Sequence, residues 1–246
     1  MALLVPRDGW SLDGFWNYWR FNHGPLVATT PQYGQFRDFY AQNYVVGDGP
    51  IGRSFSYAGA AEALIPTAPD LPPFATTDQF LSRILPDEEK FLNRSASIGL
   101  DLSDFVLIRG QGAVKLIVVS GRNSTLSHSE FRSEYLRHGQ QIRESSSLAS
   151  RLRGWLVGFV ESAPCEMSGR KLEQIPPIDC VETFWFDDLT DMAFVCTQLD
   201  GPNSSLANLF SPARESFIAA EAVFFKDGLP QTPGPVPPLR GLRELQ

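Results

Sequence analysis

The residues best suited to chemistry lie in one short stretch, FWNYWRFNHGPLV, from Phe15 to Val27. It combines aromatic side chains with His23, one of three histidines in the chain. The spacing places Trp16 and Trp19 on the helical face of His23, so this face either stacks a planar ligand or packs in the core. Gly24–Pro25 is expected to end the helix. A histidine there acts as an acid or base near neutral pH, or interacts with the helix dipole and does nothing else.

The strand-like segment FRDFYAQNYV supplies further polar groups. Side chains alternate between the two faces of a strand, so Tyr40, Gln42 and Tyr44 share one face and Asn43 points to the other. The two tyrosine hydroxyls could orient an oxygen atom of a ligand. Only one of Gln42 and Asn43 can face a pocket directly, and the sequence leaves both alternatives open.

Two carboxyl groups, those of Glu62 and Glu182, occur in otherwise apolar strands. Apolar surroundings disfavour the charged form, so either group could serve as a base or proton donor. The alternative is a structural ion pair with a nearby arginine, such as Arg37 or Arg153. Trp185 lies in the ring-dense segment ETFWF, and such segments predict an apolar cavity for an aromatic or polycyclic molecule.

The elements that must position these residues occur twice along the chain. Hydrophobic periodicity and turn residues predict the order strand, helix, strand, strand, helix, strand, and then the same order again. Ser127 and Glu130 form a capping-box pattern before the second copy's first helix, and Ser11 stands 116 positions earlier. Further matched segments support an internal duplication in which Glu62 corresponds to Glu182. These are FRDFYAQNYV with LRGWLVGFV, AGAAEALI with DCVETFWF, and DFVLIRG with EAVFFKDG.

The predicted fold class is α+β. Each copy is a βαββαβ unit of the ferredoxin-like type, whose sheet leaves one face bare. Two copies therefore predict an intramolecular pseudo-dimeric α/β barrel, with repeats at 1–110 and 113–228 and a proline-rich tail at 229–246. The proline-rich segment PTAPDLPPFATTDQF is expected to lack regular structure.

The composition of the chain excludes several classes of protein. With 43% hydrophobic residues the 246-residue chain can bury a core, and a net charge of −7 argues against nucleic-acid or anionic-membrane partners. The three cysteines lack zinc or disulfide spacing, which favours a reducing cytoplasm. No segment is typical of a signal peptide or membrane span. No nucleotide-binding, metalloprotease or serine-hydrolase motif occurs, and we expect no metal and no cofactor.

These motifs, in this order, resemble those of a known protein family. FWNYWRFNHGPLV, YAQNYV and AGAAEALI in the first copy, and KLIVVSG, LSHSEF and VETFWFDDLTDMAF in the second, resemble the EthD family of the dimeric α/β-barrel superfamily. The first copy carries the residues of the family pattern, which are Tyr18, Trp19, His23, Pro25, Leu26, Gln42, Asn43 and Glu62.

The second copy departs from that pattern. His138 follows Phe131 by seven residues, whereas His23 follows Phe15 by eight, and Gly158–Phe159 replaces the Gln42–Asn43 pair. The first copy is therefore the expected catalytic half and the second the structural half.

The resemblance implies a cofactor-independent lyase or isomerase acting on a hydrophobic aromatic, phenolic or polyketide-like molecule, with a cofactor-free oxygenase as a related alternative. The expected catalytic residues are His23, Tyr40, Tyr44, Asn43 and Glu62. The expected substrate-binding residues are Trp16, Tyr18, Trp19, Gln42, Trp185 and His138. Another alternative is a non-catalytic binding protein for an apolar metabolite. A haem protein of the superfamily would use His23 or His138 as axial ligand, and a further homodimer stays open.

Overall fold

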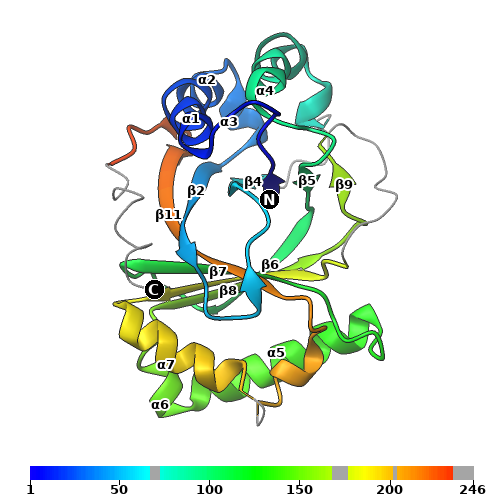
Figure 1. Ribbon diagram of the computed structural model, residues 1–246, viewed down its shortest axis with the longest axis vertical. Coiled ribbons are helices and arrows are strands. Elements are labelled where there is room, and N and C mark those ends of the chain that lie inside the picture. The colour runs from blue at the N-terminus through cyan, green and yellow to red at the C-terminus, as the bar shows by residue number, and fades with distance from the viewer. Residues whose placement is uncertain (67–72, 168–176, 202–203, 235–246) are drawn as a thin grey trace.

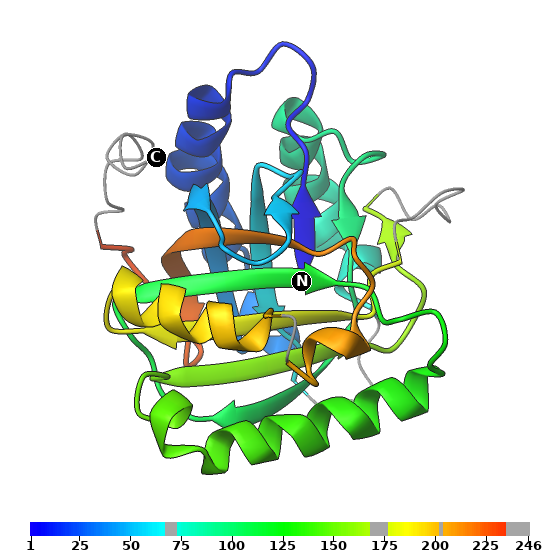
Figure 2. The ribbon, with the colours of Figure 1, turned by 60° about the horizontal axis from the view of Figure 1, so that its bottom comes forward.

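The computed structural model describes residues 1–66, 73–167, 177–201 and 204–234. The chain is an α+β protein in which a curled, almost entirely antiparallel sheet carries helices on its outer faces (Figures 1 and 2). The exception to antiparallel pairing is β3 (Arg53–Ser54), which runs parallel to β11 (Glu215–Lys226).

The first half begins with β1 and ends with β6. Its four main strands lie in the order β2-β4-β1-β5. Its elements are β1 (Ala2–Leu4), α1 (Leu12–Tyr18), η1 (Trp19–His23), α2 (Gly24–Ala28), α3 (Tyr33–Phe36), β2 (Phe39–Asp48), β3, β4 (Gly59–Leu64), η2 (Phe74–Thr76), η3 (Phe80–Ile84), α4 (Leu85–Phe91), β5 (Ile98–Gly99) and β6 (Leu102–Ile108).

The main strands of the second half lie in the order β8-β10-β7-β11. Numbered along the chain within each half, the main strands lie in the order second, third, first, fourth in both halves. Its elements are β7 (Val114–Ser120), α5 (His128–Glu144), α6 (Ser146–Ala149), β8 (Gly154–Val160), β9 (Cys165–Glu166), β10 (Cys180–Phe186), α7 (Leu189–Leu199), η4 (Ala207–Leu209), β11 and β12 (Leu229–Pro230).

Strands of one half pair with strands of the other half at two places. β11 pairs with β7 through its first residues and with β2 along most of its length. β5 pairs with β1 of its own half. β6 begins after two further residues and pairs with β8 of the second half. The sheet therefore curls back toward its own beginning, and strand pairing joins the halves at both places (Figure 1).

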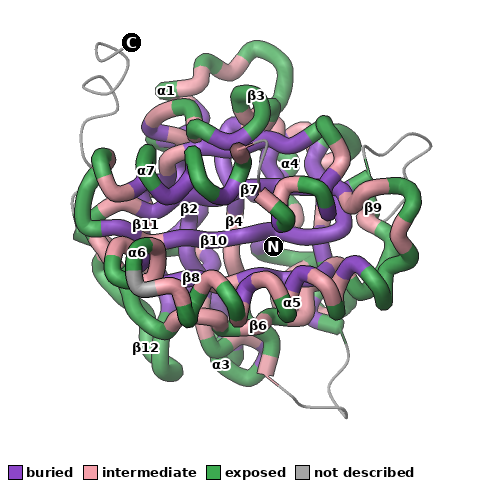
Figure 3. Tube along the Cα trace, turned by 90° about the horizontal axis from the view of Figure 1, so that it is seen from below, coloured by how far each residue is buried: buried purple, intermediate pink, exposed green. Residues whose placement is uncertain are grey.

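Three apolar clusters fill this architecture. One lies between the sheet and the first-half helices, and a second lies between the sheet and α5 and α7. The third lies inside the curl and takes residues such as Leu3, Ile117 and Phe217 from both halves. The central strands β7, β10 and β11 are mostly buried, whereas α5 exposes one side (Figure 3).

The predicted helix starts at Ser11 and Ser127 are confirmed. The Ser11 side chain accepts a hydrogen bond from the amide of Gly14, and Ser127 and Glu130 form the capping box. These side chains satisfy amide groups that have no partner within the helix.

The expectation that Gly24–Pro25 ends the first helix is wrong, because helical structure continues to Ala28. A π-helical turn precedes the proline, and the amide of Gly24 donates to the carbonyl of Trp19 five residues back. Pro25 then lies in the first turn of α2, where a missing N–H costs little. A Cβ on Gly24 would lie 2.5 Å from the Phe224 ring, so glycine permits close packing against β11.

The second first-half helix has the same construction. η3 is a π-helical segment, the amide of Leu85 donates to the carbonyl of Phe80, and a proline follows at Pro86. Short π-helical segments are frequent at functional sites. In this protein His23 is the last residue of η1, and Asp87 follows η3 in the first turn of α4.

Several other expectations concern loops. The proline-rich segment before η3 forms a 3-10 turn at Phe74–Thr76, contrary to the expectation of no regular structure, while its residues 67–72 lie outside the described residues. The predicted tail forms β12, and its residues 235–246 also lie outside. Within the described ranges, every helix is too short or too polar to cross a membrane.

Candidate active site

A pocket of about 540 Å³ lies between the first-half helices and the sheet. Its wall is mostly apolar and includes the Trp19 ring. A small number of polar side chains converge on it, as is usual for small-molecule sites. These are His23, Tyr33, Arg37, Tyr40, Glu88, Arg94, Asp101 and Ser162.

His23 forms a buried pair with Asp87 of α4. The imidazole Nδ1 lies 2.9 Å from Oδ2 of Asp87, whose side chain is only 4% exposed. The same carboxyl accepts hydrogen bonds from the Tyr18 hydroxyl at 2.6 Å and from Nζ of Lys90 at 3.1 Å. An ionised carboxylate only accepts, so the imidazole proton sits on Nδ1. Nε2 has no hydrogen-bond partner among the described residues and is free to exchange a proton with a ligand in the pocket.

The pKa of the Asp87 carboxyl lies below its usual value. Burial disfavours the charged form, but hydrogen bonds from His23, Tyr18 and Lys90 outweigh this effect. A carboxyl whose pKa is lower in the folded protein stabilises it above the unfolded pKa, and the contribution is lost as the pH falls.

We therefore expect Asp87→Asn to reduce the acid sensitivity of folding. The free energy of unfolding of the wild type should decline more steeply than that of the variant below about pH 4. Urea unfolding followed across this range checks the prediction, with Asp8→Asn, at an exposed position, as control. Equal slopes for the wild type and Asp87→Asn would contradict it.

Glu88, the next residue, is a second buried carboxyl on the pocket wall. Its Oε2 lies 3.1 Å from Nε of Arg94. Burial raises the pKa of Glu88, although His23 and Arg94 act in the opposite direction. The pocket thus holds both an imidazole group and a carboxyl group whose pKa is raised by burial.

The sequence interpretation missed Asp87 and Glu88. A usable signal was present, because Ile84 and Phe91 are buried and the two acids fall three and four residues after Ile84 on the same helical stripe. Carboxylates on an apolar stripe are seldom buried without a partner.

The polar residues of β2 divide between two faces, as the alternation predicts. Tyr40 lines the pocket, and its hydroxyl accepts a hydrogen bond from Nε2 of Gln42 at 2.9 Å. Gln42 also donates to the carbonyl of Trp19 at 2.8 Å and accepts from the Tyr44 hydroxyl. Gln42 and Tyr44 thus lie behind the pocket and hold Tyr40 and the π-helical turn in place. Burial raises the pKa of Tyr40, so its hydroxyl stays protonated.

Asn43 and Glu62 lie on the opposite face, inside the curl of the sheet. Asn43 donates to Glu62 at 2.9 Å, and Nζ of Lys115 lies 2.7 Å from the same carboxyl. The expected pairing of Glu62 with Arg37 is therefore wrong, since Arg37 lies on the His23 side. Glu62 lines a separate cavity and does not share the pocket of His23.

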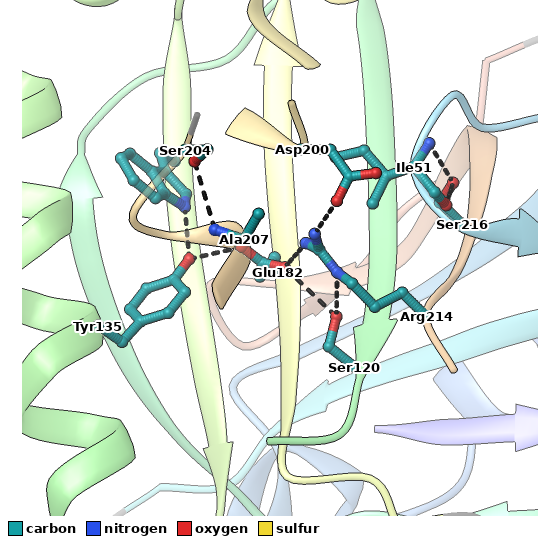
Figure 4. Close-up of polar contacts among 10 residues, drawn as sticks. Ile51, Ser120, Tyr135, Glu182, Asp200, Ser204, Ala207, Arg214 and Ser216 are labelled. Atoms are coloured by element: carbon teal, nitrogen blue, oxygen red, sulfur yellow. Dashed lines mark hydrogen bonds and ion pairs between the residues drawn. The ribbon is translucent and has the colours of Figure 1, made fainter. Parts of the chain in front are cut away.

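Glu182 faces the other way, toward α5 (Figure 4). Its carboxyl accepts from the Tyr135 hydroxyl at 2.7 Å and pairs with Nη2 of Arg214 at 2.8 Å. The expected partner Arg153 instead binds Asp187 near the surface. Strand side chains alternate, so Glu62 and Glu182 lie on opposite faces and are not structural equivalents.

The remaining expected binding residues are dispersed. Trp16 is core, with its indole N–H bound to the carbonyl of Ala58 at 2.7 Å. Tyr18 contacts Asp87, and Trp185 lines the same cavity as Glu62. His138 lies within α5, where Nδ1 is 3.0 Å from the Ser205 hydroxyl, remote in the fold from the His23 pocket.

Within the described residues, no group of three or more His, Cys, Asp or Glu side chains could hold a metal ion. All three cysteines are free, and Cys180 and Cys196 are buried.

The fold and the site define a class: an α+β protein with a curled antiparallel sheet and a histidine pocket between helices and sheet. The EthD domain model matches residues 7–95, a range that includes His23 and Asp87.

Two solved structures resemble the chain. The "anthrone oxidase-like protein" superimposes with a TM-score of 0.52 at 7% identity, covering 90% of each chain, and shows the same fold. The "putative monooxygenase from Lactobacillus acidophilus NCFM" gives a TM-score of 0.47 at 9% identity, covering 94% of this chain and 95% of the other. No curated protein sequence matches the chain.

Proposed function

We propose that the first-half pocket is the active site of an enzyme that moves protons on a hydrophobic aromatic, phenolic or polyketide-like molecule. One observation carries this proposal. His23 is oriented through Nδ1 by a buried carboxylate, while its other nitrogen is free at a mostly apolar pocket. A buried Asp–His pair of this kind fixes the tautomer of the base and stabilises the imidazolium that forms when the base takes a proton.

The other polar side chains have complementary roles in this proposal. Nε2 of His23 removes a proton from an acidic O–H or C–H group of the substrate. Glu88, held toward its neutral form, returns a proton at another atom. The Tyr40 hydroxyl and the Arg37 guanidinium orient the oxygen on which negative charge develops.

The fate of the deprotonated substrate depends on its own structure. A leaving group or a second carbonyl leads to elimination, cleavage or isomerisation, which are lyase or isomerase reactions. An electron-rich polycyclic phenolate can instead react with oxygen. The name "anthrone oxidase-like" of the structural relative supports including such phenols among the substrates tested.

A non-catalytic binding protein is the second candidate. The closed network of Gln42, Tyr40 and Tyr44 would suit a rigid binding site as well as a catalytic one. It predicts that the ligand is recovered unchanged and that replacement of His23 affects affinity only.

Incubation with a panel of phenols, anthrones and linear polyketide-like ketones separates these candidates. Products are analysed by mass spectrometry, once in air and once without oxygen. Loss of water or carbon dioxide, or an isomer of unchanged mass, under both conditions supports a lyase or isomerase. Oxygen-dependent gain of mass supports a cofactor-free oxygenase, and unchanged ligand despite binding contradicts the enzyme proposal.

We also infer that the two halves arose by duplication and pack as a pseudo-dimer. The shared strand order and the matched helix caps at Ser11 and Ser127 support this inference. In the second half the Tyr135–Glu182–Arg214 network occupies the space between helix and sheet, so that half supplies structure. Free cysteines support a cytoplasmic location.

A further inference from the structure

A second cavity of about 570 Å³ lies inside the curl of the sheet, next to the His23 pocket, with which it shares the lining residues Met1, Ala63, Ile65, Leu100 and Asp101. Strands of both halves enclose it, including β4, β6, β7, β10 and β11. The apolar cluster of Leu3, Ile117 and Phe217 fills another part of the interior. Polar residues, among them Glu62, Lys115 and Glu221, line the cavity in this part of the curl.

Negative charge is in excess around this cavity. Lys115 is 5% exposed, and its Nζ lies 2.7 Å from Glu62 and 2.5 Å from Glu221, so two carboxylates share one ammonium group. Asp101 and Asp104 also line the cavity. The other cationic group at the wall is the amino group of Met1, which donates to the carbonyl of Leu100.

Asp104 is a further carboxyl group at the wall of this cavity. It is an exposed residue at the cavity wall, and among the described residues it forms no ion pair and no hydrogen bond. Its side chain occupies the space over Gly158 of β8, where a Cβ would lie 2.8 Å from Oδ1. Burial and the neighbouring Glu62 raise the pKa of Asp104, and the nearby amino group of Met1 acts in the opposite direction.

Thr183 is a second unsatisfied group on the same wall. It is 1% exposed, and its hydroxyl has no hydrogen-bond partner in the described part of the chain. Buried hydroxyl groups nearly always have a partner, so an unpaired one that lines a cavity indicates a missing ligand or solvent. Trp185, two residues further on β10, offers an aromatic surface to the same space, and Nζ of Lys115 lies 5.3 Å from its ring.

These features favour a cationic organic ligand over a metal ion. The carboxylates do not converge on one point, and within the described residues no set of three could hold a metal. Glu62 and Glu221 are already engaged by Lys115. Asp104 and Thr183 offer oxygen acceptors to an ammonium group, and Trp185 and Leu156 offer apolar surface to the rest of the molecule.

We propose that the interior cavity is a binding site for a small protonated amine, with Asp104 and Thr183 as partners of the ammonium group and Trp185 as the surface for the apolar part. Asp104, Thr183 and Trp185 do not line the His23 pocket, and the proposal does not rest on the reaction proposed above.

Isothermal titration calorimetry with phenethylamine and butylamine tests the proposal. The neutral analogue 2-phenylethanol and the anion phenylacetate serve as matched ligands. We expect at least one amine to bind and the two analogues to bind much more weakly. Asp104→Asn should weaken amine binding by about ten- to hundredfold, as expected for loss of a charge-assisted contact.

Thr183→Val is the sharper variant, because it replaces an unpaired hydroxyl with a methyl group of similar size. It should weaken amine binding about two- to tenfold without lowering the melting temperature. Asp8→Asn and His23→Ala should bind the amine as the wild type does. Failure of both amines to bind, equal binding of 2-phenylethanol, or wild-type affinity in Asp104→Asn overturns the proposal, whatever the outcome at His23.

Discussion

His23→Ala is expected to reduce turnover of the best substrate in the panel by about 10²–10⁴-fold while leaving the fold intact. The variant removes the group that exchanges the proton, but the surrounding apolar side chains of Trp19 and Phe91 keep their contacts. Product formation is measured at saturating and at low substrate concentration. A loss in kcat with little change in KM indicates a role in the chemical step.

Asp87→Asn should reduce turnover less, because the imidazole remains. The double variant should be no slower than His23→Ala alone, since residues that act as a unit do not contribute additively. His138→Ala is the matched control, because His138 is also a helical histidine but lies outside the pocket. Full turnover in His23→Ala, or an equal loss of turnover in His138→Ala, would show that His23 has no specific role in catalysis.

Arg214→Met is expected to lower the free energy of unfolding by about 3–5 kcal/mol. The side chains of Arg214 and Glu182 are 6% and 1% exposed, and the guanidinium also binds Ser120 and Asp200. Without it, Glu182 stays buried beside Tyr135 with no positive charge to compensate it (Figure 4). Urea unfolding at neutral pH measures the loss.

A second substitution tests the cause of this loss. Glu182→Gln in the Arg214→Met background should recover part of the stability, because the neutral amide still accepts from Tyr135 and no charge is left unpaired. Arg153→Met is the matched control, since its ion pair with Asp187 is exposed, and it should change stability little. If Arg214→Met is no more harmful than Arg153→Met, the network does not stabilise the fold.

Local patterns predicted much of the fold. Strand alternation placed Tyr40, Gln42 and Tyr44 on one face and Asn43 on the other, and the serine caps at Ser11 and Ser127 marked two helix starts. The continuation of the first helix beyond Pro25 was not predictable, because the π-helical turn depends on packing of Gly24 against Phe224 from the far end of the chain.

The candidate site was only partly predictable, for a related reason. His23 could be proposed from its own segment, but Asp87 is distant in sequence and meets it only through packing of two helices. Glu62 and Glu182 looked equivalent because each is a carboxyl in an apolar strand. A shift of one position in a strand reverses the face, and only the strand pairing reveals that shift.

The exchange of β6 and β11 between the halves has a consequence for any attempt to divide the chain. A cut between Gly110 and Gly112 would leave β2 without β11 and β8 without β6, so each fragment would expose an unpaired strand edge prone to aggregation. Neither fragment should be soluble by itself, but the two together can complete each other's sheets. The molecule is therefore a natural starting point for a split protein whose reassembly reports that two attached partners have met.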